Sequence, residues 1–253
     1  MKEKIFTIKT DRDIKKANKC QYPYIADFTQ AKRIAILPNE FEFSHTHIFL
    51  CRPDMITIGD RAFANNTDLT NFGGYPQIIG DEAFSFCSNL KSFEFETVRS
   101  MGSGAFQYSG IREFNAGKDL RVLKDNTFSG CYNLTDVNLG QIEGIGHHCF
   151  ASTGISSITL NKDLKKIGNQ AFEACTFLKN IVCLCHEPPR LCESSLIGTS
   201  IEKIWLPDAE SLEKYSTAKY WSDYKDLMCL IDWNAIKLYV DHLKEERSKS
   251  KIF

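Results

Sequence analysis

Ile58-Gly59-Asp60-Arg61-Ala62-Phe63 is the first clear copy of a phrase, Ile-Gly-x-x-Ala-Phe, that recurs along the chain. Degenerate copies follow at residues 79–84, 101–106, 123–128, 145–150 and 167–172. Their final phenylalanines are 21, 22, 22, 22 and 22 residues apart. A fixed period of about 20–29 residues is typical of solenoids, in which each unit is too small to bury its own apolar face and stacks on its neighbours. The sequence therefore predicts a solenoid.

After each phenylalanine, a short polar stretch leads to a strand-like pattern such as Leu134-Thr-Asp-Val137-Asn-Leu139. Its last two apolar residues alternate with polar ones, which places them on the inner face of a half-buried strand. The glycine of the phrase is expected to permit a tight turn that a side chain would resist. The phenylalanine is expected to be a core plug, stacked on its counterparts in the adjacent units.

A second period lies on top of the first. Three residues after the phenylalanine, Cys87, Cys131 and Cys175 alternate with Ser109 and Thr153. The cysteine units reach their strand six residues after the phenylalanine and then alternate with units that need only five. This alternation identifies a seventh unit, in which residues 191–196 replace the phrase, Thr199 takes the hydroxyl position and residues 201–206 form the strand.

The pattern resembles the BspA-type leucine-rich repeat family, whose unit reads roughly I-G-x-x-A-F-x-x-C-x-x-L-x-x-I-x-L. The resemblance covers about residues 56–231, and the run from Pro188 to Tyr224 is similar to the closing unit of that family. It implies a leucine-rich-repeat solenoid, an α/β-type repeat of short parallel strands and irregular loops with a helical C-terminal cap. It also implies a surface or secreted adhesion and interaction module without catalytic residues.

Three segments are expected along the chain. Residues 1–57 are predicted to be an N-terminal cap with degenerate repeats, in which residues 28–39 form a worn strand. Residues 58–207 are the solenoid, with about seven units of 21–24 residues, and residues 208–253 are the helical C-terminal cap and tail. Asp208 can cap a helix that carries Leu212, Tyr215, Ala218, Tyr220 and Trp221. A second amphipathic stretch follows Asp232, and one face of it carries Ile236, Tyr239, Val240 and Leu243. This stretch is either a further part of the cap or a partner-binding helix.

Composition limits the function classes. A net charge of −1 gives no drive toward nucleic acid, and no run of 18 apolar residues or export signal is visible. Cysteines two repeats apart are separated by roughly 10 Å, since each repeat rises about 5 Å, and disulfides cannot span that distance. Ten free thiols favour a reducing compartment. A cytoplasmic location is expected, while the resemblance leaves the cell surface open, and the oligomeric state is open with a monomer as the simpler expectation.

Two clusters suggest chemistry, and each has a plainer explanation. Cys183, Cys185, His186 and Cys192 lie close in sequence, but Cys183 occupies an inward strand position and the spacing is not that of a structural zinc knuckle. His147-His148-Cys149 places its thiol at the buried alanine position of the phrase, where a thiol is inert. The sequence therefore favours core and loop residues over a metal-dependent or cysteine-dependent enzyme, and it predicts no metal and no cofactor.

The remaining candidate is a surface. Strand residues between the inward ones face outward, and stacking aligns them into one extended face that solenoids commonly use to bind other proteins. A plain solvated face, with Trp205 packed under the C-terminal cap, is the alternative. The predicted partner-binding residues are Ser92, Glu94, Glu113, Asn115, Asp136, Asn138, Thr159, Val182, Lys203 and Trp205.

Overall fold

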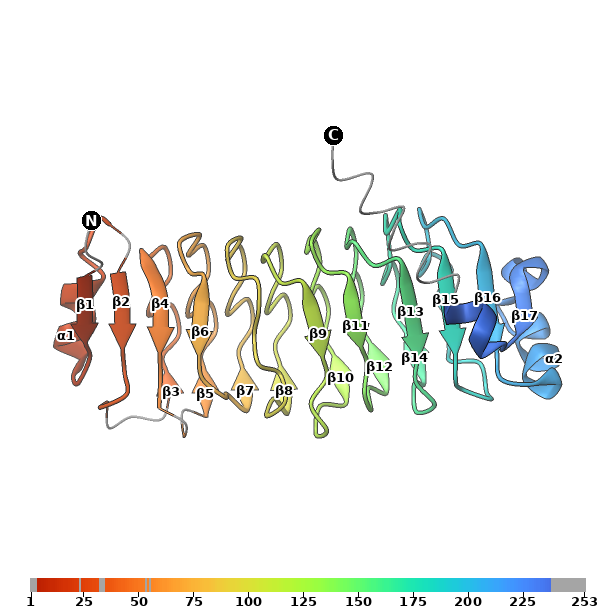
Figure 1. Cartoon of the computed structure of the whole chain (residues 1–253), viewed down its shortest axis with the longest axis horizontal. Helices are drawn as coiled ribbons and strands as arrows, with labels where there is room; N and C mark the ends of the chain where they lie inside the picture. Colours follow the sequence, from red (N-terminus) through yellow and green to blue (C-terminus); the bar gives the residue numbers. More distant parts are fainter. Residues whose placement is uncertain (1–3, 23, 32–34, 53, 55, 238–253) are drawn as a thin grey trace.

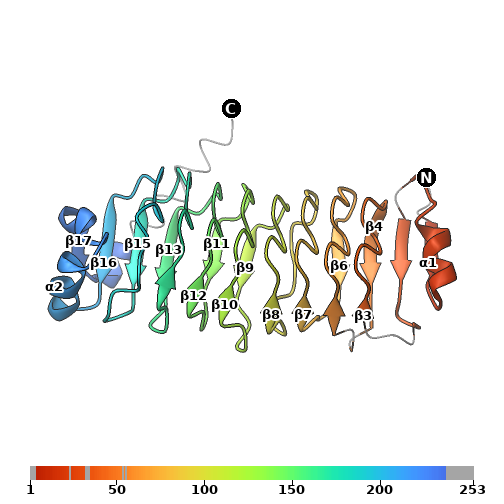
Figure 2. The ribbon, with the colours of Figure 1, turned by 180° about the vertical axis from the view of Figure 1, so that it is seen from behind.

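The computed structural model describes residues 4–22, 24–31, 35–52, 54 and 56–237. Figure 1 shows an elongated stack of turns, with helix α1 (Asp11–Ala17) at one end and helix α2 (Ala209–Thr217) at the other. Seen from behind in Figure 2, the same succession of turns runs from α1 to α2. The predicted solenoid of short parallel strands with irregular loops and a helical C-terminal cap is confirmed.

Parallel strands, one in each turn except the turn of residues 91–96, build the wider sheet, which we call the repeat sheet. Its strands form three separate hydrogen-bonded ladders, each of them parallel throughout. The first ladder runs β1 (Lys4–Thr7), β2 (Tyr24–Asp27), β4 (Thr46–Leu50) and β6 (Asn71–Gly73). The second pairs β9 (Glu113–Asn115) with β11 (Asp136–Asn138), and the third runs β13 (Ser157–Leu160), β15 (Asn180–Cys183), β16 (Lys203–Leu206) and β17 (Met228–Leu230).

The repeat phrase itself begins in a second sheet of two-residue strands, also parallel. The inner residue of each strand is the apolar residue that opens the phrase, and it is buried in every turn. The strands form two hydrogen-bonded ladders. The first runs β3 (Ala35–Ile36), β5 (Thr57–Ile58), β7 (Ile78–Ile79) and β8 (Ser100–Met101), and the second runs β10 (Val122–Leu123), β12 (Gly144–Ile145) and β14 (Lys166–Ile167).

The phenylalanine plugs form a continuous column through the core. Each plug is fully buried, and neighbouring rings stack with centroids 5.1 to 5.8 Å apart. The six predicted plugs are confirmed, and Phe41 adds a seventh, stacked on Phe63 at 5.3 Å. Phe41 stands 22 residues before Phe63, but its phrase has lost both the glycine and the alanine. The regular turns therefore begin one unit earlier than the sequence pattern shows.

Around each plug, the backbone alternates between left-handed and right-handed conformations. The residues two positions before and two positions after the plug have positive φ, as at Arg61 (φ 53°) and Asn65 (φ 59°). The N–H groups of Arg61, Phe63 and Asn65 donate to carbonyls of the next turn at 2.8 Å. The same three bonds recur in later turns, so a third backbone ladder holds the loops in register along the stack.

The phrase glycines have a different role from the predicted one. Gly80 and Gly102 have no positive φ, so turn conformation does not require glycine there. Instead, the backbone of the preceding turn lies directly against them: a Cβ on Gly102 would stand 2.3 Å from the nitrogen of Asp81, and one on Gly80 would stand 2.5 Å from the nitrogen of Asp60. Glycine is needed because two backbones touch at this point.

All ten cysteines are unpaired, and the repeat spacing predicts this for Cys87, Cys131 and Cys175. The thiols of Cys87, Cys131 and Cys175 are buried, and each donates a hydrogen bond to the carbonyl of the preceding turn's plug, at 3.0 to 3.1 Å. Burial raises the pKa of Cys131 to about 12. These cysteines act as small core residues that also satisfy a buried carbonyl.

The two ends of the stack are closed by different elements. Asp208 caps α2 as predicted, because its Oδ1 accepts the backbone N–H of Ser211 at 2.8 Å. The helix stops at Thr217, short of the predicted extent, and Trp221 is held instead by a 2.8 Å bond from its Nε1 to the carbonyl of Pro189. A 3₁₀ helix, Ser222–Leu227, follows. The predicted face residues Tyr239, Val240 and Leu243 and the charged tail lie outside the described residues.

At the N-terminal end, the strand predicted over residues 28–39 is wrong. The repeat-sheet strand is β2 (Tyr24–Asp27), and residues 35–36 belong to the second sheet, where Ile36 opens the phrase that ends in the extra plug. The first ladder runs from β4 to β6 across residues 57 and 58 without interruption. The strand pairing of the N-terminal segment therefore continues into the first regular repeat.

Candidate functional site

The outer face of the repeat sheet presents two rows of side chains in register. Glu113 and Asn115 of β9 stand opposite Asp136 and Asn138 of β11, and Thr159 of β13 starts the row that continues into β15 and β16. Eight of the ten predicted partner-binding residues are exposed here: Ser92, Glu94, Glu113, Asn115, Asp136, Asn138, Thr159 and Lys203. Strand pairing puts Glu113 and Asn115 in register with Asp136 and Asn138, whereas Ser92 and Glu94 lie outside the paired strands. The binding role of the eight residues stays a prediction.

The prediction of exposure is wrong for Val182 and Trp205. They are only 3% and 4% exposed because Ile236, from the segment after β17, packs on them. The Trp205 indole Nε1 donates to the side-chain oxygen of Asn180, which is itself fully buried. An apolar pair on a sheet face gains stability when it is covered, and the C-terminal segment supplies that cover. The described part of this segment therefore acts as cap.

The repeat sheet is interrupted where Ser92 and Glu94 lie, between β6 and β9. The inward strand positions explain the interruption: Phe95 stands between Gly74 of the preceding turn and Ala116 of the next, so a bulky residue has two very small neighbours. The Phe95 ring is only 3% exposed and packs on Phe106, Phe114 and Phe128, which follow it in the stack. Residues 91–96 carry no regular strand pairing, and the surface sinks into hollows on both sides of them.

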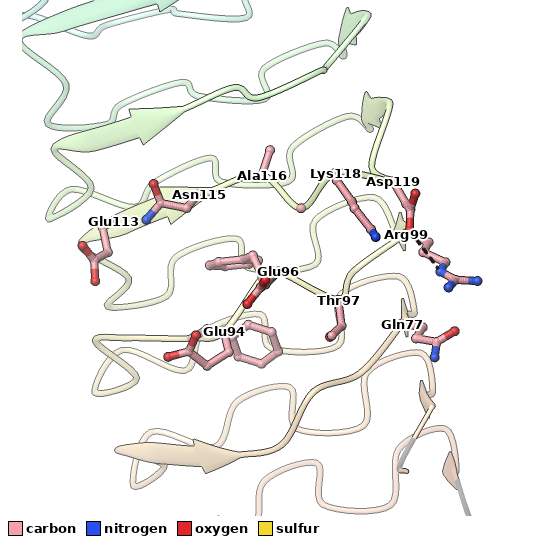
Figure 3. Close-up of a pocket in the computed structure, with 13 residues that line it drawn as sticks. Gln77, Glu94, Glu96, Thr97, Arg99, Glu113, Asn115, Ala116, Lys118 and Asp119 are labelled. Carbon is pink, nitrogen blue, oxygen red and sulfur yellow. Dashed lines mark ion pairs between the residues drawn. The ribbon is translucent and has the colours of Figure 1, made fainter. Parts of the chain in front are cut away.

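The larger hollow has a volume of about 790 Å³. Figure 3 shows Glu94 and Glu113 projecting to the same side of it, with Arg99 and Asp119 at its other end. Arg99 and Asp119 form an ion pair at 3.5 Å. Within the described part of the chain, Glu94, Glu96 and Glu113 have no ion-pair partner. The hollow is therefore open, acidic and lined by exposed polar groups over a phenylalanine floor.

The cysteine cluster at residues 183–192 does not converge on one point. Cys183 and Cys185 are buried, and desolvation raises the pKa of both thiols. His186 instead forms an ion pair with Asp208 at 2.9 Å, and Cys192 is half-buried. Among the residues that the structure describes, no group of three or more His, Cys, Asp or Glu is arranged to hold a metal ion.

The His147-His148-Cys149 run is divided by the fold. The Cys149 thiol is fully buried, and desolvation raises its pKa, which disfavours a thiolate nucleophile. His147 Nδ1 accepts the backbone N–H of Asn169 at 3.1 Å, and His148 pairs with Glu173 at 3.1 Å. The two histidines are therefore turn residues that connect neighbouring repeats, as the plainer interpretation predicted.

Sequence reasoning missed the hollows and the cover over Trp205. The hollow had a readable signal, because Gly74 and Ala116 occupy strand positions that hold leucine in other units. The sequence signal for the segment that covers Trp205 is weaker. Val182 and Trp205 are adjacent outward positions, and two large apolar residues side by side on an outer face indicate that another element lies above them. Ile236 was recognised as part of an apolar stripe, but nothing in the sequence locates the surface that this stripe meets.

These features define a parallel-strand solenoid of leucine-rich-type repeats with a helical cap at its C-terminal end. The chain belongs to the BspA type leucine rich repeat family, whose model matches six copies over residues 56–179 and 118–218. The resemblance seen in the repeat phrase is confirmed. No curated protein matches the chain.

The similar solved structures include two leucine-rich proteins. A leucine rich cell surface protein from Faecalibacterium prausnitzii A2-165 is 23% identical with a TM-score of 0.57, covering 61% of this chain and 44% of that one. A leucine-rich repeat protein from Bacteroides ovatus ATCC 8483 is 19% identical with a TM-score of 0.37, covering 90% and 76%. This chain thus spans less than half of the first protein's length, and the likeness concerns the fold. None of the described helices is long and apolar enough to cross a membrane.

Proposed function

We propose that this protein is a non-catalytic interaction scaffold that binds another protein through the exposed face of its repeat sheet. The observation that carries the proposal is the aligned polar face, in which Glu113 and Asn115 stand opposite Asp136 and Asn138 on consecutive strands. Repeat solenoids present extended faces of this kind to their partners, and the family's repeats suggest the same role. Val182 and Trp205 are no longer part of the proposed surface, because the cap covers them.

The buried thiols support a role without catalysis. Cys149 and Cys183 are desolvated and have raised pKa values, so both favour the unreactive thiol form. Glu94, Glu96 and Glu113 line open hollows rather than an enclosed site that excludes water. An acidic, solvated face suits recognition of a complementary basic surface more than it suits general acid–base chemistry.

The test begins with affinity capture from the native lysate and mass spectrometry, with binding of each captured protein then measured after purification. The informative variant carries Glu94→Lys and Asp136→Lys on the repeat-sheet face. The matched control carries Lys124→Glu and Lys166→Glu on the second-sheet side, where both side chains are exposed. We expect the partner to bind the wild type and the control but not the face variant. Equal loss in both variants would show that the face is not the binding surface.

A surface-exposed, adhesin-like protein is the second candidate, supported by the family and by the similar structure described as a cell surface protein. The ten unpaired cysteines favour the cytoplasmic alternative, since oxidising compartments promote disulfides. Labelling of intact cells with a membrane-impermeant amine reagent distinguishes the two. Labelled protein from intact cells would support the surface location, and label only after lysis would support the cytoplasm.

A further inference from the structure

An uncharged, aromatic surface runs along the loops that follow the plugs. We define the corner ridge as residues 85–89, 107–111, 129–133 and 151–155, the equivalent loop in four consecutive turns. None of these positions carries a charged residue, although 25% of the chain is charged. Three large rings stand out of the ridge: Phe86 is 44% exposed, Tyr108 38% and Tyr132 63%.

The rings of the corner ridge form one patch across three turns. Phe86 and Tyr108 stack with centroids 4.8 Å apart, and Tyr132 follows at 6.4 Å from Tyr108. Gly130 makes room for the Tyr108 ring, because a Cβ there would lie 2.3 Å from its Cδ1 atom. The patch is therefore continuous, and the side chains between the rings are hydroxyl and amide groups such as Ser88 and Asn133.

The fold does not require these rings. Phe86 and Tyr108 have φ of 59° and 54°, a conformation that bulky residues adopt at a cost and that asparagine and glycine adopt readily. At the same position, other described turns carry Phe43, Asn65, Gly130, Ser152 and Ala174, so most of them need no ring there. In the isolated chain, an exposed aromatic ring at positive φ is unfavourable for two reasons: its apolar surface is in contact with water, and its backbone conformation is strained. Phe43 shares both features but stacks on no ring among the described residues, whereas Phe86, Tyr108 and Tyr132 form one contiguous aromatic patch. A contiguous exposed apolar patch points to a contact made outside the chain.

We propose that the corner ridge is a self-association surface, through which two copies of this chain form a two-fold symmetric dimer. Interface cores are depleted of charge and enriched in tyrosine and phenylalanine, which is the composition of the corner ridge. In a two-fold dimer each surface meets itself, so a charged patch would repel its copy. The repeat-sheet face carries Glu94, Glu113 and Asp136, so two copies of that face would repel each other. The corner ridge does not, and a net charge of −1 adds little repulsion between whole chains.

The size of the corner ridge sets the strength of the dimer. Four turns at about 4.8 Å each give a ridge about 15 Å long between its outer turns. A standard-size interface buries roughly 800 Å² per partner, equivalent to a square about 28 Å on a side. The corner ridge is smaller than that, so the dimer is reversible and depends on concentration. This proposal is independent of the partner that the repeat-sheet face binds.

Sedimentation velocity of the full chain from about 1 to 200 μM tests the proposal, since this range spans micromolar dissociation constants. We expect the weight-average sedimentation coefficient of the wild type to rise from the monomer value toward the dimer value. Phe86→Asn with Tyr108→Asn, which suits the positive φ, is expected to weaken the dimer at least tenfold. Phe43→Asn is the matched control: Phe43 has the same backbone position (φ 53°) and is 69% exposed, but it lies outside the ridge.

Circular dichroism and a thermal melt show whether each variant is folded, and Tyr132→Ser, at an exposed position without positive φ, provides a second ridge variant. We expect Tyr132→Ser to weaken the dimer as well, and Phe43→Asn to leave it unchanged. A wild type that remains monomeric at the highest concentration overturns the proposal and leaves the ridge to a different protein. Folded ridge variants that dimerise as strongly as the wild type also overturn it.

Discussion

Replacing Phe106 with alanine tests the core column at a ring that packs against four other rings. The ring is fully buried and contacts four others, with centroids at 5.0 Å from Phe93, 5.1 Å from Phe84, 5.2 Å from Phe95 and 5.8 Å from Phe128. Such a deletion typically costs about 3–5 kcal/mol, and the upper half of that range applies where the surroundings cannot collapse. Backbone bonds of 2.7 and 2.9 Å fix the turns on both sides, so we expect about 4–5 kcal/mol.

Urea unfolding followed by two signals measures the effect. All three tryptophans, Trp205, Trp221 and Trp233, lie in the C-terminal part of the chain, so fluorescence reports on that end while circular dichroism reports on the whole stack. Because repeat units are stabilised mainly by their neighbours, a central cavity is expected to separate the two transitions. Phe106→Leu, which leaves a smaller cavity, is the control and should cost much less. A loss below about 1 kcal/mol with coincident transitions would contradict the packing described here.

Three further predictions follow from local contacts. In the native protein at pH 8, iodoacetamide should modify the half-buried Cys20 and Cys192 but spare Cys87, Cys131 and Cys149, because burial raises the pKa of these three thiols. Peptide mass spectrometry identifies the modified cysteines, and rapid modification of Cys131 would contradict its burial. Gly102→Ala should lower the free energy of unfolding in urea by at least about 1–3 kcal/mol, because the added Cβ would clash with the backbone of the preceding turn. Gly104→Asn, at φ 61° with the nearest neighbouring atom 3.4 Å from the added Cβ, should change it by less than about 0.5 kcal/mol. Equal losses in the two variants would contradict the close backbone approach at Gly102. In the folded state, the hydrogen bond from the Ser211 backbone N–H lowers the pKa of Asp208 below its ordinary value of 3.8, so the ionised Asp208 stabilises the fold above pH 3.8. The difference in Tm between the wild type and Asp208→Ala should therefore shrink as the pH falls below that value. A difference in Tm that stays constant with pH would exclude a charged cap.

The repeat phrase predicts the fold because it is itself the packing unit. Ile58, Ala62 and Phe63 recur at a fixed spacing and are buried in the structure, so period alone identifies the plug and the inward strand residues. The sequence correctly places a glycine at the second position of the phrase, but the turn conformation predicted for it is not why glycine is needed. Local sequence favours a turn at Gly59, and only the neighbouring backbone shows that the absent side chain makes room for the preceding turn.

The surface was harder to predict than the core. Outward positions such as Glu113 and Asp136 follow from alternation along a strand, and the structure places them in register. Alternation does not reveal what lies above an outward residue, and for that reason Trp205 was assigned to the open face although Ile236 covers it. The interruption at Phe95 similarly depends on two small residues in different turns, each about 21 residues away.

The sequence by itself determined the period, the plugs, the buried thiols, the capping role of Asp208 and the family to which the chain belongs. The tertiary structure alone decided which outward residues remain exposed, where the repeat sheet opens into hollows and which rings of the corner ridge meet. The physical reason is that each repeat carries its own burial pattern within about 22 residues, whereas a surface is formed by side chains from several turns and from the cap. Contacts of that kind exist only after the turns have stacked.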